Sequence, residues 1–166
     1  MIVVLMGVCG CGKSTVGAAL AQTLGWRFYD ADAFHSPANV AKMGSGQPLT
    51  DEDRWPWLDA MATAMREVDA RGGNAVLACS ALRESYRDRL KRAGDVRIVF
   101  LDGDRDTIAA RLATRSHEYM PASLLDSQFA ALERPADALR IDVRLSVDAQ
   151  VDAIRRGLAL TTESRA

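Results

Sequence analysis

An N-terminal segment has residue types and a spacing that suit the binding of phosphate groups. Residues 7–14 read Gly-Val-Cys-Gly-Cys-Gly-Lys-Ser and fit the pattern G-x-x-x-x-G-K-[ST]. The glycines allow a tight turn that points backbone N–H groups at phosphate oxygens, and a helix that follows adds its positive end. Lys13 would then reach the β- and γ-phosphates of a nucleotide, and the Ser14 hydroxyl would ligate Mg²⁺. The nucleotide contacts expected here come from Gly7, Val8, Cys9, Gly10, Cys11, Gly12, Lys13, Ser14 and Thr15.

Two carboxylates follow the second strand-like run of the chain. Asp30 and Asp32 are two positions apart, so an extended segment places both on one side, at the rim that also holds the phosphate-binding segment. Phosphoryl transfer to a hydroxyl needs a carboxylate that accepts the proton, and we assign this role to Asp32. Asp30 is expected to support Mg²⁺ from its outer shell, with Ser80 helping through water. The alternative interpretation is that both aspartates only cap the next helix.

Four arginines are candidates for neutralising anionic charge. Arg111 and Arg115 are four positions apart and share a helix face; we expect Arg111 on the nucleotide and Arg115 on the transferring phosphoryl group. Their alternative role is to complement a helix C-terminus. Arg54 follows a polar loop and could clamp a substrate carboxylate with its planar guanidinium, or belong to a capped helix start. Arg83 begins a basic helical face that could also bind the substrate or be solvated.

Short apolar strand-like runs alternate with helical runs, which predicts a parallel sheet with helices on both faces. The expected strands are 2–6, 26–30, 75–79, 97–101 and 141–147. The expected helices are 13–24, 36–43, 54–71, 84–93, 105–115, 121–133 and 148–159. Ligands of such a sheet bind beyond the carboxyl ends of the strands, which is where the candidate residues lie.

Local signals define several helix ends. Gly25 and the pair Gly72-Gly73 are expected to end two helices, because glycine readily adopts the left-handed conformation of a helix C-cap. Pro56 should lie in the first turn of its helix, where no N–H partner is lost, with Asp51 or Asp53 as the N-cap.

Length and composition predict one domain in an ordinary globular protein. The chain has 166 residues, of which 48% are hydrophobic and 26% charged, and its net charge of −1 argues against a nucleic-acid binder. No run approaches the ~20 apolar residues of a membrane span. The odd set Cys9, Cys11 and Cys79 predicts no disulfide framework, so we expect a cytoplasmic protein. Cys9 and Cys11 are either redox-sensitive thiols or small residues that the loop tolerates.

The motifs together resemble those of the gluconate kinases (gluconokinases), a group of small P-loop kinases. The segments that carry the resemblance are residues 6–15, 30–35, 42–54, 57–58, 79–83, 86–87, 126–133 and Pro135. The phosphate-binding segment is common to many P-loop proteins. The stretch 42–54 and the segment Cys-Ser-Ala-Leu-Arg at 79–83 are specific to this group.

The resemblance implies ATP-dependent phosphorylation of D-gluconate at its 6-hydroxyl, with Mg²⁺, in carbohydrate metabolism connected with the pentose phosphate route. It implies an α/β P-loop NTPase fold over 1–166, with a five-stranded parallel sheet in the order 2-3-1-4-5. It also implies a small lid near 116–120 and a homodimer, and we expect the tail at 160–166 to be mobile. The implied substrate-binding set is Asp32, His35, Lys42, Arg54, Arg83 and Gln128. The chain departs from the group in its loop cysteines, which replace the usual serines, and in a weakly patterned lid.

Three other functions compete with this one. A small P-loop kinase for shikimate or a nucleotide would share Lys13, Ser14 and the lid arginines but differ in residues 42–57. A GTPase switch would carry a guanine-reading Asn-Lys-x-Asp, and no asparagine of this chain is followed by lysine. A nucleotide-binding regulator without catalysis is disfavoured by the presence of Lys13, Ser14 and Asp32.

Overall fold

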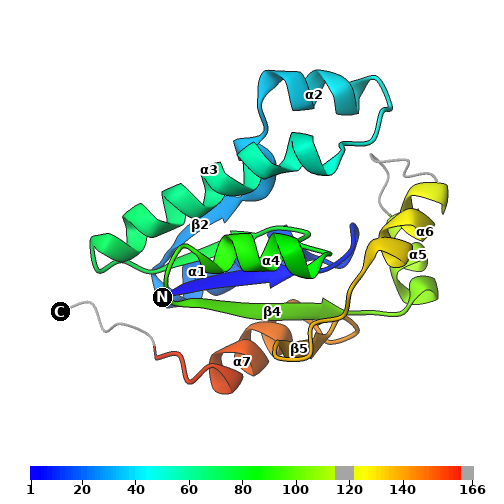
Figure 1. Cartoon of the computed structure of the whole chain (residues 1–166). Helices are drawn as coiled ribbons and strands as arrows, with labels where there is room; N and C mark the ends of the chain where they lie inside the picture. The colour runs from blue at the N-terminus through cyan, green and yellow to red at the C-terminus, as the bar shows by residue number, and fades with distance from the viewer. Residues whose placement is uncertain (115–121, 162–166) are drawn as a thin grey trace.

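The computed structural model of the protein describes residues 1–114 and 122–161. Its strands form one parallel sheet in the order β2-β3-β1-β4-β5, which confirms the expected topology (Figure 1). The strands are β1 (Ile2–Met6), β2 (Arg27–Asp30), β3 (Ala75–Ala78), β4 (Val96–Asp102) and β5 (Leu139–Asp142). Because all strands run in the same direction, their carboxyl ends meet along a single edge of the sheet.

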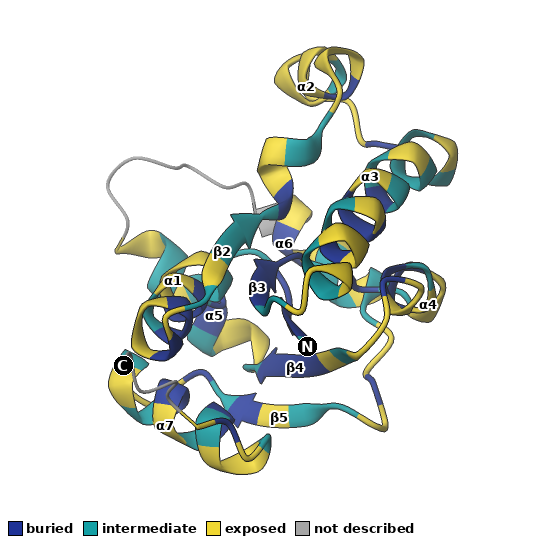
Figure 2. Cartoon of the chain, turned by 90° about the vertical axis from the view of Figure 1, so that its left-hand side faces the viewer, coloured by how far each residue is buried: buried dark blue, intermediate teal, exposed yellow. Residues whose placement is uncertain are grey.

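Helices cover both faces of this sheet, and Figure 2 shows that the buried residues concentrate on the strands and on the helix sides facing them. The helices are α1 (Lys13–Leu24), α2 (Pro37–Gly44), α3 (Asp51–Ala70), α4 (Glu84–Lys91), α5 (Arg105–Ala113), α6 (Ala122–Ala131) and α7 (Val147–Gly157), with a 3₁₀ turn η1 (Ala31–Phe34). Among the described residues, no helix is both long and apolar enough to span a membrane.

The side chains of β1 alternate between the two halves of the core. Val3 and Leu5 pack into the cluster that holds the buried residues of α1 and α7, whereas Ile2, Val4 and Met6 pack with those of α3 and α4. This is the period-two pattern of a strand that is buried on both faces. The central strand β1 is therefore packed on both faces, and the phosphate-binding segment that follows it begins at a well-packed strand end.

Two element boundaries differ by more than two residues from the sequence predictions. The last strand ends at Asp142 instead of continuing to residue 147, because the Ser146 hydroxyl accepts the N–H of Ala149 and starts α7. Helix α3 starts at Asp51, so the predicted cap was wrong: Thr50 is the N-cap, and Asp53 completes a capping box with it. Pro56 consequently lies in the second turn, not the first. 

The predicted glycine caps are confirmed. Gly25 has φ 71° at the end of α1, and Gly72 has φ 68° just after α3. Both helices therefore end where the local sequence indicated, at the edge of the sheet opposite to the carboxyl ends of the strands.

Candidate active site

The phosphate-binding segment lies between the end of β1 and the start of α1, and two of its glycines have no room for a side chain. Gly7 has φ 146°, and a Cβ built there would lie 2.8 Å from Cys11 Sγ and 2.9 Å from the Leu101 carbonyl oxygen. Gly10 has φ 83°, and its Cβ would lie 2.8 Å from the Leu112 side chain. The loop thus depends on glycine both for backbone conformation and for packing against β4 and α5.

Lys13 and Gln128 both contact the phosphate-binding loop. The Lys13 ammonium donates to the carbonyl oxygens of Gly7 and Val8, each at 3.0 Å, so its charge already lies over the loop. The Cys9 N–H donates to Gln128 Oε1 at 2.6 Å, which joins α6 to the loop. Gln128, which only the family resemblance had indicated, therefore lies at the loop.

Burial governs the chemistry of two cysteines near the loop. Burial raises the pKa of the Cys11 thiol, and the nearby Lys13 charge only partly offsets this effect. Burial likewise raises the pKa of Cys79 to about 12. Because the thiolate is the reactive form, both thiols are poor nucleophiles at neutral pH. At Cys11 the structure favours the interpretation of a small residue that packs against the loop.

Ser14 and Asp30 form a pair of oxygen groups at the start of α1. The Ser14 hydroxyl donates to Asp30 Oδ2 at 2.7 Å, while Asp30 Oδ1 accepts the N–H of Asp32 at 3.1 Å. Asp30 therefore caps η1, as the alternative interpretation held, and also faces the predicted metal ligand. Ser80 approaches the loop through its backbone, because its carbonyl oxygen accepts the Gly7 N–H at 3.2 Å.

This pair fits Mg²⁺, which prefers oxygen ligands and keeps several of its waters in nucleotide sites. Across residues 1–114 and 122–161, no group of three or more His, Cys, Asp or Glu side chains is arranged to hold a metal ion. A hydroxyl with a carboxylate behind it is what a nucleotide-bound magnesium requires from a protein, since the phosphates and water supply the other ligands.

Asp32 lies in η1 with its carboxylate open to solvent and next to a fixed histidine. The Asp32 side chain is 92% exposed, and its Oδ1 lies 4.0 Å from His35 Nε2. The His35 ring stacks on Trp57 with centroids 4.5 Å apart, and Trp57 Nε1 donates to the Ala31 carbonyl oxygen at 2.7 Å. Burial lowers the pKa of His35; the Asp32 charge opposes this shift and the Arg54 charge adds to it. His35 is therefore a neutral, well-positioned neighbour of Asp32 at pH 7.

A single carboxylate, Asp51, joins the two arginines that the sequence indicated as substrate ligands. Arg83 Nη1 donates to Asp51 Oδ2 at 2.9 Å, and Arg54 Nη1 lies 3.7 Å from Asp51 Oδ1. The Tyr86 hydroxyl donates to Asp51 Oδ1 at 2.5 Å. The guanidinium carbons of Arg54 and Arg83 lie 5.7 and 5.8 Å from the Tyr86 ring centroid. Ion pairs this exposed stabilise a fold by only about 0–1 kcal/mol, so the arrangement matters more for position than for stability.

Lys42 is engaged elsewhere. Its ammonium lies 2.5 Å from Asp53 Oδ2, and Asn39 Nδ2 donates to the Asp53 carbonyl oxygen at 3.0 Å, so both residues join α2 to α3. The Lys42 hydrogen bond and the Thr50 N–H together lower the pKa of Asp53 from 3.8 to about 2. Lys42 is thus a proposed substrate ligand whose charge is already neutralised within the helical scaffold.

The depressed pKa of Asp53 predicts a specific acid sensitivity. Because the folded-state pKa lies below the ordinary value of 3.8, the ionised carboxylate stabilises the fold above that pH, and this contribution is lost as the pH falls toward about 2. Asp53→Asn should therefore lose less stability than the parent protein over this window, measured as urea midpoints. Glu52→Gln in the same helical turn is the control. Parallel curves for Asp53→Asn and the parent would contradict the assignment.

Arg111 lines a hollow of about 320 Å³ beside the phosphate-binding loop. Its Nη2 donates to the carbonyl oxygen of Val143, just after β5, and this hydrogen bond holds the guanidinium in the wall of the hollow. The walls of the hollow are Cys11, Gly12, Thr15, Val16, Arg111, Thr114, Leu145, Ser146, Val147 and Gln150. Its place suits the base and ribose of a nucleotide whose phosphates occupy the loop. Sequence analysis missed Leu145–Val147, which the end of the last strand at the carboxyl edge could have indicated.

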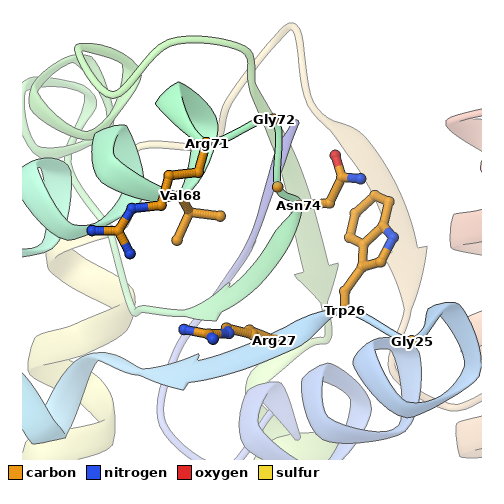
Figure 3. Close-up of a pocket in the computed structure, with 8 residues that line it drawn as sticks. Gly25, Trp26, Arg27, Val68, Arg71, Gly72 and Asn74 are labelled. Carbon is orange, nitrogen blue, oxygen red and sulfur yellow. The ribbon is translucent and has the colours of Figure 1, made fainter.

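A second hollow of about 310 Å³ lies at the opposite edge of the sheet, between the ends of α1 and α3. Figure 3 shows that Arg27 and Arg71 extend to the same side, away from Trp26 and Asn74. The charged groups do not converge with the other polar groups, and the hollow is remote from the phosphate-binding loop. The predicted lid at 116–120, Arg115 and the end of the tail lie outside the described residues.

Comparisons with known proteins find a shikimate kinase family domain and relatives that are gluconokinases. The family model described as "Shikimate kinase" matches residues 9–142. The gluconokinase of Gluconobacter oxydans (strain 621H) is 49% identical over 153 residues, which cover 91% of this chain and 85% of that protein. The thermosensitive gluconokinase of Escherichia coli (strain K12) is 38% identical over 167 residues, covering 98% of this chain and 89% of that protein.

Solved structures give the same result. A gluconokinase from Sinorhizobium meliloti 1021 superposes with a TM-score of 0.83 at 41% identity, over 97% of this chain and 93% of that one. The shikimate kinase of Bacteroides thetaiotaomicron superposes with a TM-score of 0.66 at 21% identity, over 96% of this chain and 99% of that one, and shows the shared fold.

Proposed function

This chain belongs to the gluconokinases and carries the shikimate kinase family domain, and on that premise we propose that it transfers the γ-phosphoryl group of ATP to the 6-hydroxyl of D-gluconate. The observation that carries the proposal is the likeness to named gluconokinases over nearly the whole chain. The geometry agrees, because a phosphate-binding loop, an exposed carboxylate and a pair of arginines lie at one edge of the sheet.

ATP binding follows from the loop and the adjoining hollow. Arg111 and the segment after β5 hold the base and ribose, and the loop N–H groups with the positive end of α1 hold the phosphates. Lys13 contributes a compact positive charge for the β- and γ-phosphates. Ser14, with Asp30 behind it, would hold Mg²⁺, which when bound would neutralise charge on the phosphate oxygens.

In the transfer step, the substrate 6-hydroxyl oxygen forms a bond to the γ-phosphorus while the bond from that phosphorus to the β,γ-bridging oxygen breaks. The hydroxyl proton moves to the Asp32 carboxylate, and ADP leaves with the electron pair of the broken bond. His35, neutral and stacked on Trp57, borders the Asp32 carboxylate. We assign Arg115 to the transferring phosphoryl group, as the lid predictions imply.

The substrate carboxylate is the natural partner of Arg54 and Arg83. Both guanidiniums are partly exposed, and each presents N–H donors in a planar fork that matches a carboxylate. Arg54 also acts electrostatically on His35, which places it on the Asp32 side of the site. Gluconate would thus lie with its 6-hydroxyl at Asp32 and its carboxylate toward the arginines.

The experiment that tests this function measures ADP release with Mg·ATP against D-gluconate, other sugar acids, shikimate and nucleoside monophosphates. Turnover confined to D-gluconate is the expected result. Turnover with shikimate or a nucleotide instead would keep the kinase fold and reject the substrate. ATP binding without turnover of any acceptor would favour a regulator.

The magnesium assignment has its own test. Asp30→Asn should raise the Mg²⁺ concentration for half-maximal activity by about 10–100-fold, the usual cost of removing an outer-shell partner. It should leave the maximal rate at saturating Mg²⁺ within a few-fold. Asp104→Asn is the matched control, because Asp104 also caps a helix through its carboxylate. An unchanged Mg²⁺ requirement in Asp30→Asn would reject the role.

We also propose that the enzyme acts in the cytoplasm, in carbohydrate metabolism that feeds the pentose phosphate route, and as a homodimer. Light scattering at several protein concentrations tests the oligomeric state, and a monomer mass throughout would reject the dimer.

A further inference from the structure

We propose that Asp51 is a positioning residue that sets the spacing of Arg54 and Arg83 and thereby the affinity for the acid group of the substrate. The inference rests on the proposed function, since it assigns those two arginines to a substrate carboxylate. What it adds is the residue between them, which sequence analysis considered only as a helix cap.

The charge balance suits one anionic group. Two guanidiniums on one side of a site repel each other, and a carboxylate between them offsets that repulsion. Asp51 contacts Arg83 Nη1 at 2.9 Å and Arg54 Nη1 at 3.7 Å, so the three side chains carry a net charge of about +1 by ordinary protonation states. That is the charge that complements a single substrate carboxylate.

The guanidiniums keep donors for a ligand. A guanidinium has five N–H groups, and the hydrogen bonds and ion pairs of each arginine with Asp51 or Tyr86 are made through Nη1. Within the described part of the chain, no other hydrogen bond holds either guanidinium. Arg54 is held loosely, at 3.5 Å from the Tyr86 hydroxyl oxygen, which leaves it free to turn toward a bound acid.

The base under the arginines is rigid. The Tyr86 side chain is buried, donates its hydroxyl to Asp51 at 2.5 Å, and packs edge-on against Trp55 at 5.6 Å between ring centroids. The Arg89 guanidinium lies 5.0 Å from the Trp55 ring centroid and makes a two-point contact with Asp59 at 2.6 and 2.7 Å. Asp51 is thus fixed by the packing of α3 on α4. Binding residues that are carried by packed helices are positioned more accurately than residues carried by loops.

Two physical roles of Asp51 give opposite results on removing its charge. If Asp51 only competes with the substrate for the arginines, Asp51→Asn makes the site more positive and lowers the KM for gluconate. If Asp51 positions the arginines, the same substitution lets them separate and raises that KM, because misplacement by about 1 Å is enough to lose much of an oriented contact. The direction of the change therefore decides between the two.

The experiment is steady-state kinetics of the full-length enzyme with Asp51→Asn, Tyr86→Phe and Glu52→Gln. We expect the KM for D-gluconate to rise about tenfold in Asp51→Asn, with kcat and the KM for ATP within about threefold, the pattern of lost ground-state binding. Tyr86→Phe, which keeps the ring and removes the hydroxyl, should raise the same KM by a smaller factor. Glu52→Gln removes a charge from the same helical turn and should change neither KM.

The outcomes separate the inference from the function beneath it. A parent enzyme that does not phosphorylate gluconate overturns the proposed function and the inference with it. A parent enzyme that does, with Asp51→Asn unchanged or lower in KM, overturns the positioning role alone. A lower thermal midpoint together with a lower kcat and a higher KM for both substrates would show a purely structural role for Asp51, which also overturns the positioning role. Tyr86→Phe keeps the inference testable if Asp51→Asn fails to fold.

Discussion

Asp32→Asn should lower kcat for gluconate phosphorylation by about 10²–10⁴-fold, the range that a positioned general base contributes. Asparagine has nearly the same shape but cannot accept the hydroxyl proton. The Asp32 carboxylate is exposed, and the neutral His35 ring lies 4.0 Å from it. The substitution should therefore leave the thermal midpoint and the dissociation constant for ATP almost unchanged. Steady-state product assays measure kcat, and isothermal titration calorimetry with ATP measures the dissociation constant.

The matched control for this variant is Asp106→Asn, an exposed aspartate on α5 that is outside the proposed site. It should behave as the parent enzyme in both assays. Equal losses of turnover and ATP affinity in Asp32→Asn would contradict the assignment, because a proton acceptor for the substrate hydroxyl has no contact with ATP in the ground state.

The second large effect is expected at Lys13. Lys13→Met should lower kcat by about 10²–10³-fold, the usual loss when one group that stabilises transition-state charge is removed. It should also weaken ATP binding, because the ammonium lies over the loop that receives the phosphates. Loss of both quantities distinguishes this variant from Asp32→Asn. The measurements are the same two assays.

Lys13→Arg tests whether a guanidinium can replace the ammonium group at this position. We expect little rescue, because a planar guanidinium cannot reproduce the compact ammonium that donates to the Gly7 and Val8 carbonyl oxygens. Lys91→Met is the control, since Lys91 pairs with Asp137 on the surface. Near-parental turnover in Lys13→Met would reject the role of this residue in the transfer.

Sequence alone predicted the parts of the site whose conformation depends on near neighbours. The loop at 7–14 follows from glycines that tolerate positive φ, and Gly7 and Gly10 do adopt it. The central strands β1, β3 and β4 follow from short apolar runs, which are buried on both faces of the sheet. The order of the strands came from the family resemblance, because local patterns do not state which strands pair.

The predictions of two element boundaries were wrong for local reasons, because the sequence offered more than one possible capping residue. Thr50, Asp51 and Asp53 are all good N-cap residues, and only the backbone of α3 decides that Thr50 accepts the Asp53 N–H. The strand predicted at 141–147 was cut short by the Ser146 cap. In both places two short-range preferences competed within a few residues, and a local capping hydrogen bond set the boundary.

What the sequence by itself determined is the chemistry available: a phosphate-binding loop, a carboxylate at its rim and arginines for an acid. What only the tertiary structure decided is which charges remain available to a ligand. Lys42 is neutralised by Asp53, Asp51 joins Arg83 across 32 positions of the chain, and Gln128 reaches Cys9 across 119. Local patterns arise from sterics within a few residues, whereas such pairs form only when separate helices pack together, so no spacing along the chain reveals them.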